Sequence, residues 1–571
     1  MVDLSSDWWP NLQFGPCGAR QKLMVLGCRS INEEVYAAAS SFFRRSGSTV
    51  ASVSAPMAAN NKNNDDLDQL LRQKMPQKVA KSNSGADPKR PQSPFLSENS
   101  KRVLERVRDL MRDAIYMKKT EVPDLTLSKL REEYVNLDWE NRQRALVVLS
   151  SQFGVDRERV RDLINHYTSL NLETEEDSDG TEAALYRTEH DLRSALTPLS
   201  GRLFEQMNGQ AGGLKFLVDL RADLLNTLKV QNLASLRALD TELKGLFATW
   251  LGPACVELRQ ITWDNSAALL EKIVAYEAVH PVSNLYDLKR RLGVGRRCYS
   301  YFHPAIPGEP LVFIEVALSS DVVGSIQSVL FEEPPIAEAD ATTAMFYSIS
   351  STQTGLAGID LGNFLIKGVV RLLQHDMPNI QTFVTLSPIP GFMNWLLPKL
   401  ELQIKLCASN TAENSNGTDE VNPSSAFKEE LLFAEEESAL LNVTREDKDT
   451  TAIEMLRDLL KSPDQEWAKS KELTEVIRPI LMRLCARYIL QEKKRGRALD
   501  PVTNFHLRNG ASVERLNWMG DTSPNGLKTY AGMMVNYMYR LEQIESNNQA
   551  YLNKGVIAAS SAMEGHLKSR L

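Results

Sequence analysis

Residues 346–392 read FYSISSTQTGLAGIDLGNFLIKGVVRLLQHDMPNIQTFVTLSPIPGF and decide the fold of the domain that contains them. The stretch opens with an apolar run of strand length, passes through three glycines and continues with a broad helical apolar face. A second β-rich run, residues 382–386, ends at Ser387, where the following prolines are expected to stop ladder pairing. Strand, glycine loop, helix and strand predict a crossover unit.

The glycines of this unit, Gly355, Gly358 and Gly362, precede the expected helix. Bare amide groups and the positive end of the helix dipole gather at such a helix start, and both favour a phosphate-bearing ligand. The spacing matches neither the ATP-type loop nor the dinucleotide pattern. A tight turn with close helix packing explains the glycines equally well, so the loop alone leaves both readings open.

The totals describe an ordinary globular protein of 571 residues, 43% of them hydrophobic and 24% charged. This length is enough for two or three domains. The formal net charge of -7 argues against nucleic acid as the main partner. We expect no transmembrane segment, because no apolar run approaches the roughly 20 residues that span a bilayer. The six cysteines include no C-x-x-C pair, which is typical of neither a zinc site nor a disulfide framework.

Composition divides the chain into three parts. Residues 1–97 resemble a weak targeting presequence followed by a polar linker, and Met57 is an alternative start. Residues 98–251 have helical apolar spacing almost throughout and predict an all-helical bundle, for which scaffolding or subunit contact is the simplest role. Residues 252–571 mix strand and helix signals and hold the glycine loop. Within them, residues 530–544 predict a helix.

His506 is the most interesting titratable residue of the last part. It lies in a short run between turn signals, and Phe505 and Leu507 on either side are expected to bury it and keep it neutral. Asn504 and Asn509 are candidates to hold one tautomer. A lone histidine is more often structural, and the residues alone favour that reading. No histidine spacing predicts a metal site.

Ser387 and Asp360 are the other candidates. Ser387 stands at the carboxyl end of a predicted strand, the position at which α/β folds bind ligands, although a turn serine would stand there too. No nucleophile elbow surrounds it, which argues against a hydrolase. Asp360 lies in the glycine loop, where an N-terminal helix cap or a partner of the helix dipole is its simplest role and orientation of a neighbouring group the alternative.

The chain ends in Ser569-Arg570-Leu571, a variant of the S-K-L address. We therefore expect the peroxisomal import receptor to bind this end. The predicted location is the peroxisome, with the mitochondrion or cytoplasm as alternatives.

Four blocks together resemble the malonyl-CoA decarboxylase family, of a plant-like type, and the similarity spans roughly residues 98–571. The blocks are HPVSNLYDLKRRLGVGRRCYSYFHPAIPGEPL, FYSISSTQTGLAGIDLGNFLIK, LSPIPGF and PVTNFHLRNGA. The resemblance implies a helical domain used in tetramer formation, followed by a catalytic domain of the GNAT acetyltransferase type.

The resemblance also assigns residues. It implies catalytic roles for Ser387 and His506, and leaves open in which direction a proton moves between them. It implies a CoA-binding loop of Ala357, Gly358, Ile359, Asp360, Leu361, Gly362 and Asn363. Acetyltransferases generally carry Gln or Arg where this loop has Ala357, and Gly where it has Asp360. We therefore expect main-chain contacts to CoA from the loop.

The implied reaction converts malonyl-CoA to acetyl-CoA and CO2 in fatty-acid metabolism. No cofactor is expected, because the thioester itself accepts the electron pair that CO2 leaves behind. The implied partners are malonyl-CoA and further copies of the chain, as a homotetramer. The alternative function is a GNAT-type acyltransferase that uses an acyl-CoA, and a non-catalytic assembly role is the third hypothesis.

Overall fold

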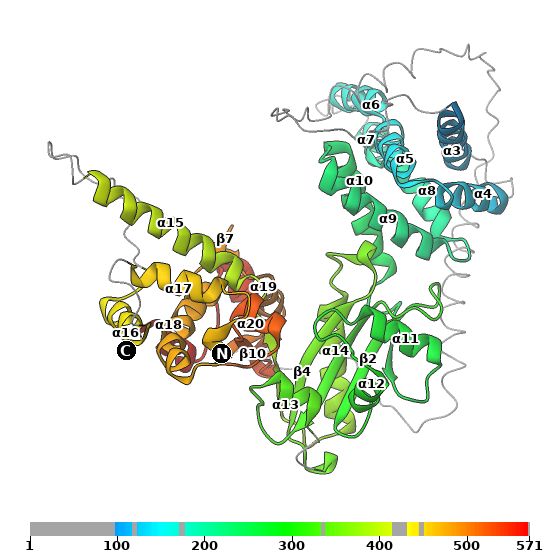
Figure 1. Cartoon of the computed structure of the whole chain (residues 1–571). Helices are drawn as coiled ribbons and strands as arrows, with labels where there is room; N and C mark the ends of the chain where they lie inside the picture. Colours follow the sequence, from blue (N-terminus) through cyan, green and yellow to red (C-terminus); the bar gives the residue numbers. More distant parts are fainter. Residues whose placement is uncertain are drawn as a thin grey trace, which may run out of the picture. The chain divides into compact units, whose positions relative to one another are not determined.

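The computed structural model describes residues 98–116, 123–170, 178–332, 337–413, 431–444 and 450–568. Both predicted targeting signals, residues 1–97 and Ser569-Arg570-Leu571, lie outside these described residues. A helical segment comes first and is followed by a domain that mixes strands and helices (Figure 1). The predicted α+β class, with the helical part first, is confirmed.

Amphipathic helices build the segment up to Trp250. On α9, the side chains Leu214, Leu217, Leu220 and Leu224 recur at helical spacing and are all buried. Their face packs into the core of the segment. The helices are α3 (Glu98–Tyr116), α4 (Pro123–Val135), α5 (Trp139–Gln152), α6 (Arg157–Ser169), α7 (Ser178–Leu196), α8 (Leu199–Asn208), α9 (Gly213–Val230) and α10 (Ala234–Trp250).

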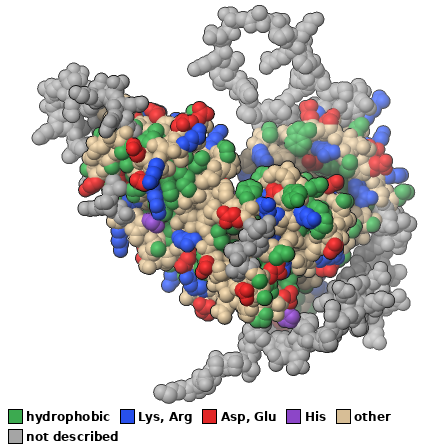
Figure 2. Space-filling model, turned by 60° about the horizontal axis from the view of Figure 1, so that its bottom comes forward, with side chains coloured by type: hydrophobic (Ala, Val, Ile, Leu, Met, Phe, Trp, Pro, Cys, Tyr) green, Lys and Arg blue, Asp and Glu red, His purple; other side chains and the backbone are tan. Residues whose placement is uncertain are grey.

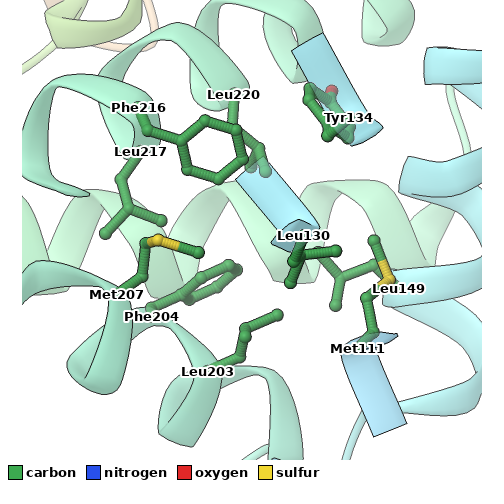
Figure 3. A pocket seen from close by; sticks show the side chains of 10 residues that line it. All are labelled: Met111, Leu130, Tyr134, Leu149, Leu203, Phe204, Met207, Phe216, Leu217 and Leu220. Atoms are coloured by element: carbon green, nitrogen blue, oxygen red, sulfur yellow. The ribbon is translucent and has the colours of Figure 1, made fainter. Parts of the chain in front are cut away.

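A small apolar cavity lies inside this core (Figure 3). It is lined by Met111, Leu130, Tyr134, Leu149, Leu203, Phe204, Met207, Phe216, Leu217 and Leu220. Its walls carry a single polar group, the Tyr134 hydroxyl, and this group donates a hydrogen bond to Asp223. The cavity includes none of the predicted site residues. It is a packing gap between helices and offers a polar substrate nothing to bind.

The main sheet runs in the order β1-β2-β3-β4-β5-β10-β6, and β9 pairs with β10. Strands β5 and β6 follow one edge of β10, while β9 follows the other. The strands are β1 (Glu257–Ile261), β2 (Arg296–Phe302), β3 (Val312–Ser319), β4 (Thr343–Ser351), β5 (Thr382–Thr385), β6 (Ser387–Pro388), β9 (Ser512–Asn517) and β10 (Met534–Met538). A separate ladder joins β7 (Lys493–Lys494) to β8 (Arg497–Ala498).

The predicted crossover unit is confirmed as β4, the helix α14 (Leu361–Asp376) and β5. Strands β4 and β5 are parallel, in a register that runs from Thr343 opposite Thr382 to Phe346 opposite Thr385. The ladder ends there, although β4 continues to Ser351. The second half of β4 therefore pairs with β3 on one side and has no described strand on the other.

The chain does not leave the sheet at Ser387, contrary to the expectation from the prolines. Strand β6 continues the ladder along β10, with Ser387 opposite Val535 and Pro388 opposite Met534. A proline lacks an N–H donor but keeps its carbonyl acceptor, so a two-residue strand at this position remains possible.

The helix predicted over residues 530–544 is wrong. Those residues hold β10, whose Val535 and Tyr537 are fully buried between strands on both edges. Pairing on two sides outweighs the local propensity of a short segment. The helices of this part are α11 (Ala267–Tyr276), α12 (Leu285–Arg291), α13 (Ile326–Phe331), α15 (Phe392–Glu413), α16 (Ala434–Thr444), α17 (Ala452–Lys461), α18 (Lys471–Leu490), α19 (Pro501–Arg508), α20 (Pro524–Tyr530), α21 (Ile544–Lys554) and α22 (Ser561–Lys568).

A buried arginine fixes α12 against the sheet. The Arg291 guanidinium donates to Asp287 on its own helix, to the His280 carbonyl and, at 3.2 Å, to Glu315 on β3. Burial, with Glu277 nearby, raises the pKa of Glu315 to about 8, although Arg291 acts in the opposite direction. Charged groups this deep are tolerated only when they are paired. Arg291 therefore holds together α12, β3 and the chain around His280.

We expect Arg291→Met to lower the free energy of unfolding by about 3–5 kcal/mol, because it leaves buried carboxyl groups without their cation. The measurement is urea unfolding of both proteins at neutral pH. The matched control is Lys289→Met, an exposed position on the same helix, which we expect to change stability by about 0.5 kcal/mol or less. Equal stability losses for the two variants would contradict the role given to Arg291.

Candidate active site

Ser387 and His506 meet in the structure, although 119 residues separate them in the chain. The Ser387 Oγ lies 3.3 Å from His506 Nε2 and donates a hydrogen bond of 2.9 Å to Thr385 Oγ1. The two side chains are 6% and 3% exposed. A hydroxyl and an imidazole in contact at the end of a strand form a pair that can hold and move a proton.

His506 lies on α19, not in an irregular run between turns. Asp500 caps this helix by accepting hydrogen bonds from the backbone amides of Val502 and Thr503, and Pro501 occupies its first turn. Aspartate followed by proline is a start signal for a helix, so the sequence did contain the information. The helix fixes the direction from which His506 approaches Ser387.

Two tyrosines contact the imidazole, Tyr537 on β10 and Tyr539 directly after the end of that strand. The Tyr539 hydroxyl lies 2.8 Å from His506 Nδ1, and the Tyr537 ring stacks on the imidazole with centroids 4.5 Å apart. This burial lowers the pKa of His506 to about 3, because a charged imidazole would lose its hydration there. His506 is therefore neutral at physiological pH, as the sequence analysis expected.

The sequence analysis missed Tyr539 and assigned its role to asparagines. Asn504 instead accepts a hydrogen bond from Tyr551. Burial raises the pKa of Tyr539, and the neighbouring Asn509 acts weakly in the opposite direction. Tyr537 and Tyr539 are two residues apart, on β10 and in its direct continuation, a spacing that places side chains on one face of an extended chain. That alternation was the available signal, and the helix prediction for residues 530–544 concealed it.

The glycine loop ends at an uncapped helix. Asp360 occupies the N-cap position of α14, but its side chain makes no capping hydrogen bond. The backbone N–H groups of Gly358, Asp360, Gly362 and Asn363 find no acceptor among the described residues. Four free amides at the positive end of a helix are suited to an anion.

Residues of α9 in the helical segment pack against this loop and hydrogen-bond to it. The Arg221 side chain on α9 is buried and donates to the carbonyl oxygens of Gly355 and Ala357, at 2.6 and 3.0 Å. Its Nε pairs with Asp240 on α10. Gly355 approaches α9 so closely that a Cβ there would lie 1.8 Å from the Val218 carbonyl oxygen. Only glycine fits at this position.

The loop also contacts the helix that carries His506. A Cβ on Gly362 would lie 3.2 Å from the ring of Phe505, the neighbour of His506. Asp360 forms an ion pair of 3.6 Å with Arg508 on α19. The cap predicted for Asp360 is therefore wrong, and its alternative role, orientation of a neighbouring group, fits the ion pair. These contacts place the free amides and the Ser387–His506 pair beside the same helix.

Other functional features are few in the part of the chain that the structure describes. No group of three or more His, Cys, Asp or Glu residues there could hold a metal ion. None of the described helices combines the length and apolar character needed to cross a membrane. On the face that Figure 2 shows, lysines and arginines are interspersed with acids. Such mixing produces no large field of one sign.

Comparisons with known proteins agree with this geometry. Residues 153–251 match the family model described as malonyl-CoA decarboxylase N-terminal domain, and residues 254–571 match the C-terminal domain model. The chain is 42% identical over 424 residues to a mitochondrial malonyl-CoA decarboxylase of Anser anser anser, covering 73% of this chain and 78% of that protein. It is 41% identical over 428 residues to the Rattus norvegicus protein of the same name, covering 74% and 81%.

Solved structures give the same result. A malonyl-CoA decarboxylase from Rhodopseudomonas palustris superposes with a TM-score of 0.65 at 35% identity, covering 81% of this chain and 99% of that one. One from Agrobacterium vitis superposes with a TM-score of 0.66 at 33% identity, covering 81% and 99%. The models match more than half of the chain, and the relatives exceed 40% identity over most of it. The chain belongs to the malonyl-CoA decarboxylase family of enzymes.

Proposed function

We propose that this chain converts malonyl-CoA to acetyl-CoA and CO2, with Ser387 and His506 as its catalytic residues. The observation that carries the proposal is the buried contact between these two side chains beside a loop of free amides. Family membership supports the substrate. The same two features would serve an acyltransferase, but the family models and the relatives named above favour the decarboxylase.

CoA would bind along the loop and the open half of β4. The free amides of Gly358, Asp360, Gly362 and Asn363 are donors for its pyrophosphate. The β4 edge beyond Phe346 has no strand partner on the β5 side, so its backbone is available to the amide groups of the pantetheine arm. This opening between two parallel strands also supports the GNAT-type fold that the resemblance implies.

The reaction has two steps. The bond between the malonyl carboxylate and Cα breaks, CO2 leaves, and the electron pair moves onto the thioester as an enolate. The Nε2–H bond of His506 then breaks as a Cα–H bond forms, which gives acetyl-CoA. Ser387 donates a hydrogen bond to the developing oxyanion, and a fixed donor of this kind is typically worth about 3–4 kcal/mol. The imidazolate of His506 finally takes a proton from water, and the hydroxide that this leaves is released to the solvent.

Tyr539 would set the hydrogen positions for this transfer. Its hydroxyl donates to Nδ1, which leaves the hydrogen of the neutral imidazole on Nε2, facing Ser387. After the transfer the same hydroxyl stabilises the negative charge on the ring. Burial, which raises the pKa of Tyr539, keeps the phenol protonated and available as a donor.

Assembly and location complete the proposal. We propose a homotetramer formed through the helical domain, residues 98–251. Its exposed apolar side chains support this, since Tyr116, Leu125, Tyr186 and Val230 each expose at least 60% of their surface. We propose a role in fatty-acid metabolism and import into peroxisomes through Ser569-Arg570-Leu571. The bird and rodent relatives are named mitochondrial, which keeps the mitochondrion as the alternative. The plant-like character stays a prediction.

The direct test supplies purified protein with malonyl-CoA labelled in its free carboxyl group and counts released CO2. We expect the wild type to release CO2. The rate of release should be about 10²–10⁴-fold lower for His506→Ala, because a general acid contributes this much. Calorimetry should show CoA binding unchanged in the variant. The control is His375→Ala, an exposed histidine on α14 that contacts Asp376. Acetyl transfer to amines without CO2 release would favour the acyltransferase instead.

Tyr539→Phe should lower kcat by about 10- to 100-fold, because it removes one hydrogen bond to a ring that becomes charged. The KM for malonyl-CoA should stay nearly constant, since the hydroxyl does not contact CoA. Steady-state kinetics measures both. Tyr530→Phe is the matched control, because it deletes another buried hydroxyl, one that binds Asp521 away from the site. An unchanged kcat in Tyr539→Phe would refute the assignment of the hydrogens.

The pH profile tests the charge of His506. An exposed histidine titrates near pH 6.5, whereas burial holds the pKa of His506 at about 3. The imidazole is thus already neutral at any pH well above 3, and kcat/KM should be flat between about pH 5.5 and 7.5. Malonyl-pantetheine is the substrate to use, because it has no phosphate that titrates in this range. A change in kcat/KM centred near pH 6.5 would contradict the proposal that His506 acts as a neutral proton donor.

A further inference from the structure

The glycine loop faces a lysine of the helical segment. Gly358 has φ +76°, and a Cβ there would lie 3.2 Å from Nζ and 3.5 Å from Cε of Lys244 on α10. Lys244 is exposed and forms no hydrogen bond or ion pair with any residue that the structure describes. The ammonium group therefore lies against the loop without a partner there.

The neighbouring acids of α10 are engaged elsewhere. Asp240, one turn before Lys244, pairs with Arg221, and Glu242 accepts a hydrogen bond of 2.7 Å from Ser200. Residues 240 and 244 share a helix face. Asp240 on this face pairs with Arg221 of α9, which binds the loop carbonyls, and Lys244 on the same face reaches Gly358.

The position is unfavourable for an unpaired cation. Gly358 lies three residues before α14, whose first turn carries free N–H groups and the positive end of the helix dipole. The other cation beside the loop, Arg508, is compensated by Asp360, whereas Lys244 has no such acid. A bound anion would remove this repulsion and receive the ammonium and the amides together.

We propose that Lys244 binds a phosphate group of CoA, so that the helical segment supplies part of the substrate site. This inference rests on the proposed function, because it takes malonyl-CoA as the ligand. In this arrangement Arg221 binds the loop carbonyls, so that they do not face the phosphates. The free amides donate to the phosphates, and Lys244 adds a positive charge. The helical segment then has a role in substrate binding in addition to assembly.

The test compares Lys244→Met with the wild type on malonyl-CoA. We expect KM to rise about tenfold with kcat unchanged, because one charge-assisted hydrogen bond to the phosphate is lost. Lys229→Met is the matched control: it removes a charge from the same segment at the end of α9, where Lys229 binds Asn226. Lys244→Arg keeps the charge and should hold KM near the wild-type value. An unchanged KM in Lys244→Met would overturn the inference.

Truncated substrates separate phosphate binding from a structural role. On malonyl-pantetheine, which has no phosphate, wild type and Lys244→Met should have equal kcat/KM, and an equal loss on both substrates would refute the inference. Malonyl-dephospho-CoA lacks only the 3′-phosphate. If wild type and Lys244→Met have the same KM for it, Lys244 binds the 3′-phosphate; if the KM of the variant is still higher, Lys244 binds the pyrophosphate. CO2 release by the wild type tests the proposed function separately, and calorimetric binding of CoA to both proteins tests Lys244 even if no CO2 is released.

Discussion

The site depends on the pairing of β10. One edge of this strand fixes β6, with Val535 opposite Ser387, while Tyr537 on the strand and Tyr539 directly after it contact the imidazole of His506. Asn536, directly before Tyr537, donates to the Thr385 carbonyl at 2.7 Å and fixes β5 as well. Because the side chains of a strand alternate, a slip of one residue would turn both tyrosines away from the imidazole. The register of β10 therefore positions the hydroxyl and the imidazole at once.

Burial gives the two ends of the site opposite properties. At the Ser387–His506 end, desolvation makes the protonated imidazole unfavourable, so the ring is neutral. At the loop end, free amides and the helix dipole provide positive potential, and the buried Arg221 guanidinium is occupied by the loop carbonyls and Asp240. An anionic, hydrated CoA tail suits the second environment. Loss of CO2 from a carboxylate suits the first, because the charge it carries moves onto a thioester oxygen beside fixed donors.

Local sequence patterns predicted those structural features that depend on short stretches of the chain. The periodicity of residues 346–392 was enough for the crossover unit, whereas the expectation that the sheet ends at Ser387 was wrong because β6 pairs with β10. The contact of Ser387 with His506 was implied only by the family resemblance, because a spacing of 119 residues leaves no local trace. Tyr539 and Arg221 were missed for the same physical reason: both act through hydrogen bonds to residues far away in the sequence. β10 was misread because its pairing on both edges, not its own propensity, makes it a strand.

The contacts of α9 and α10 with the loop show that the helical segment helps to determine the conformation of the glycine loop. A scaffold alone would not require Gly355 to lie against the α9 backbone, nor a buried guanidinium to hold two loop carbonyls. The Ala357 carbonyl that Arg221 binds shares a trans peptide unit with the Gly358 N–H, so this amide points away from Arg221. The direction of the Gly358 amide is therefore set by a residue more than a hundred positions earlier in the chain. Because the loop conformation depends on this packing, the helical segment and the glycine loop form one structural unit.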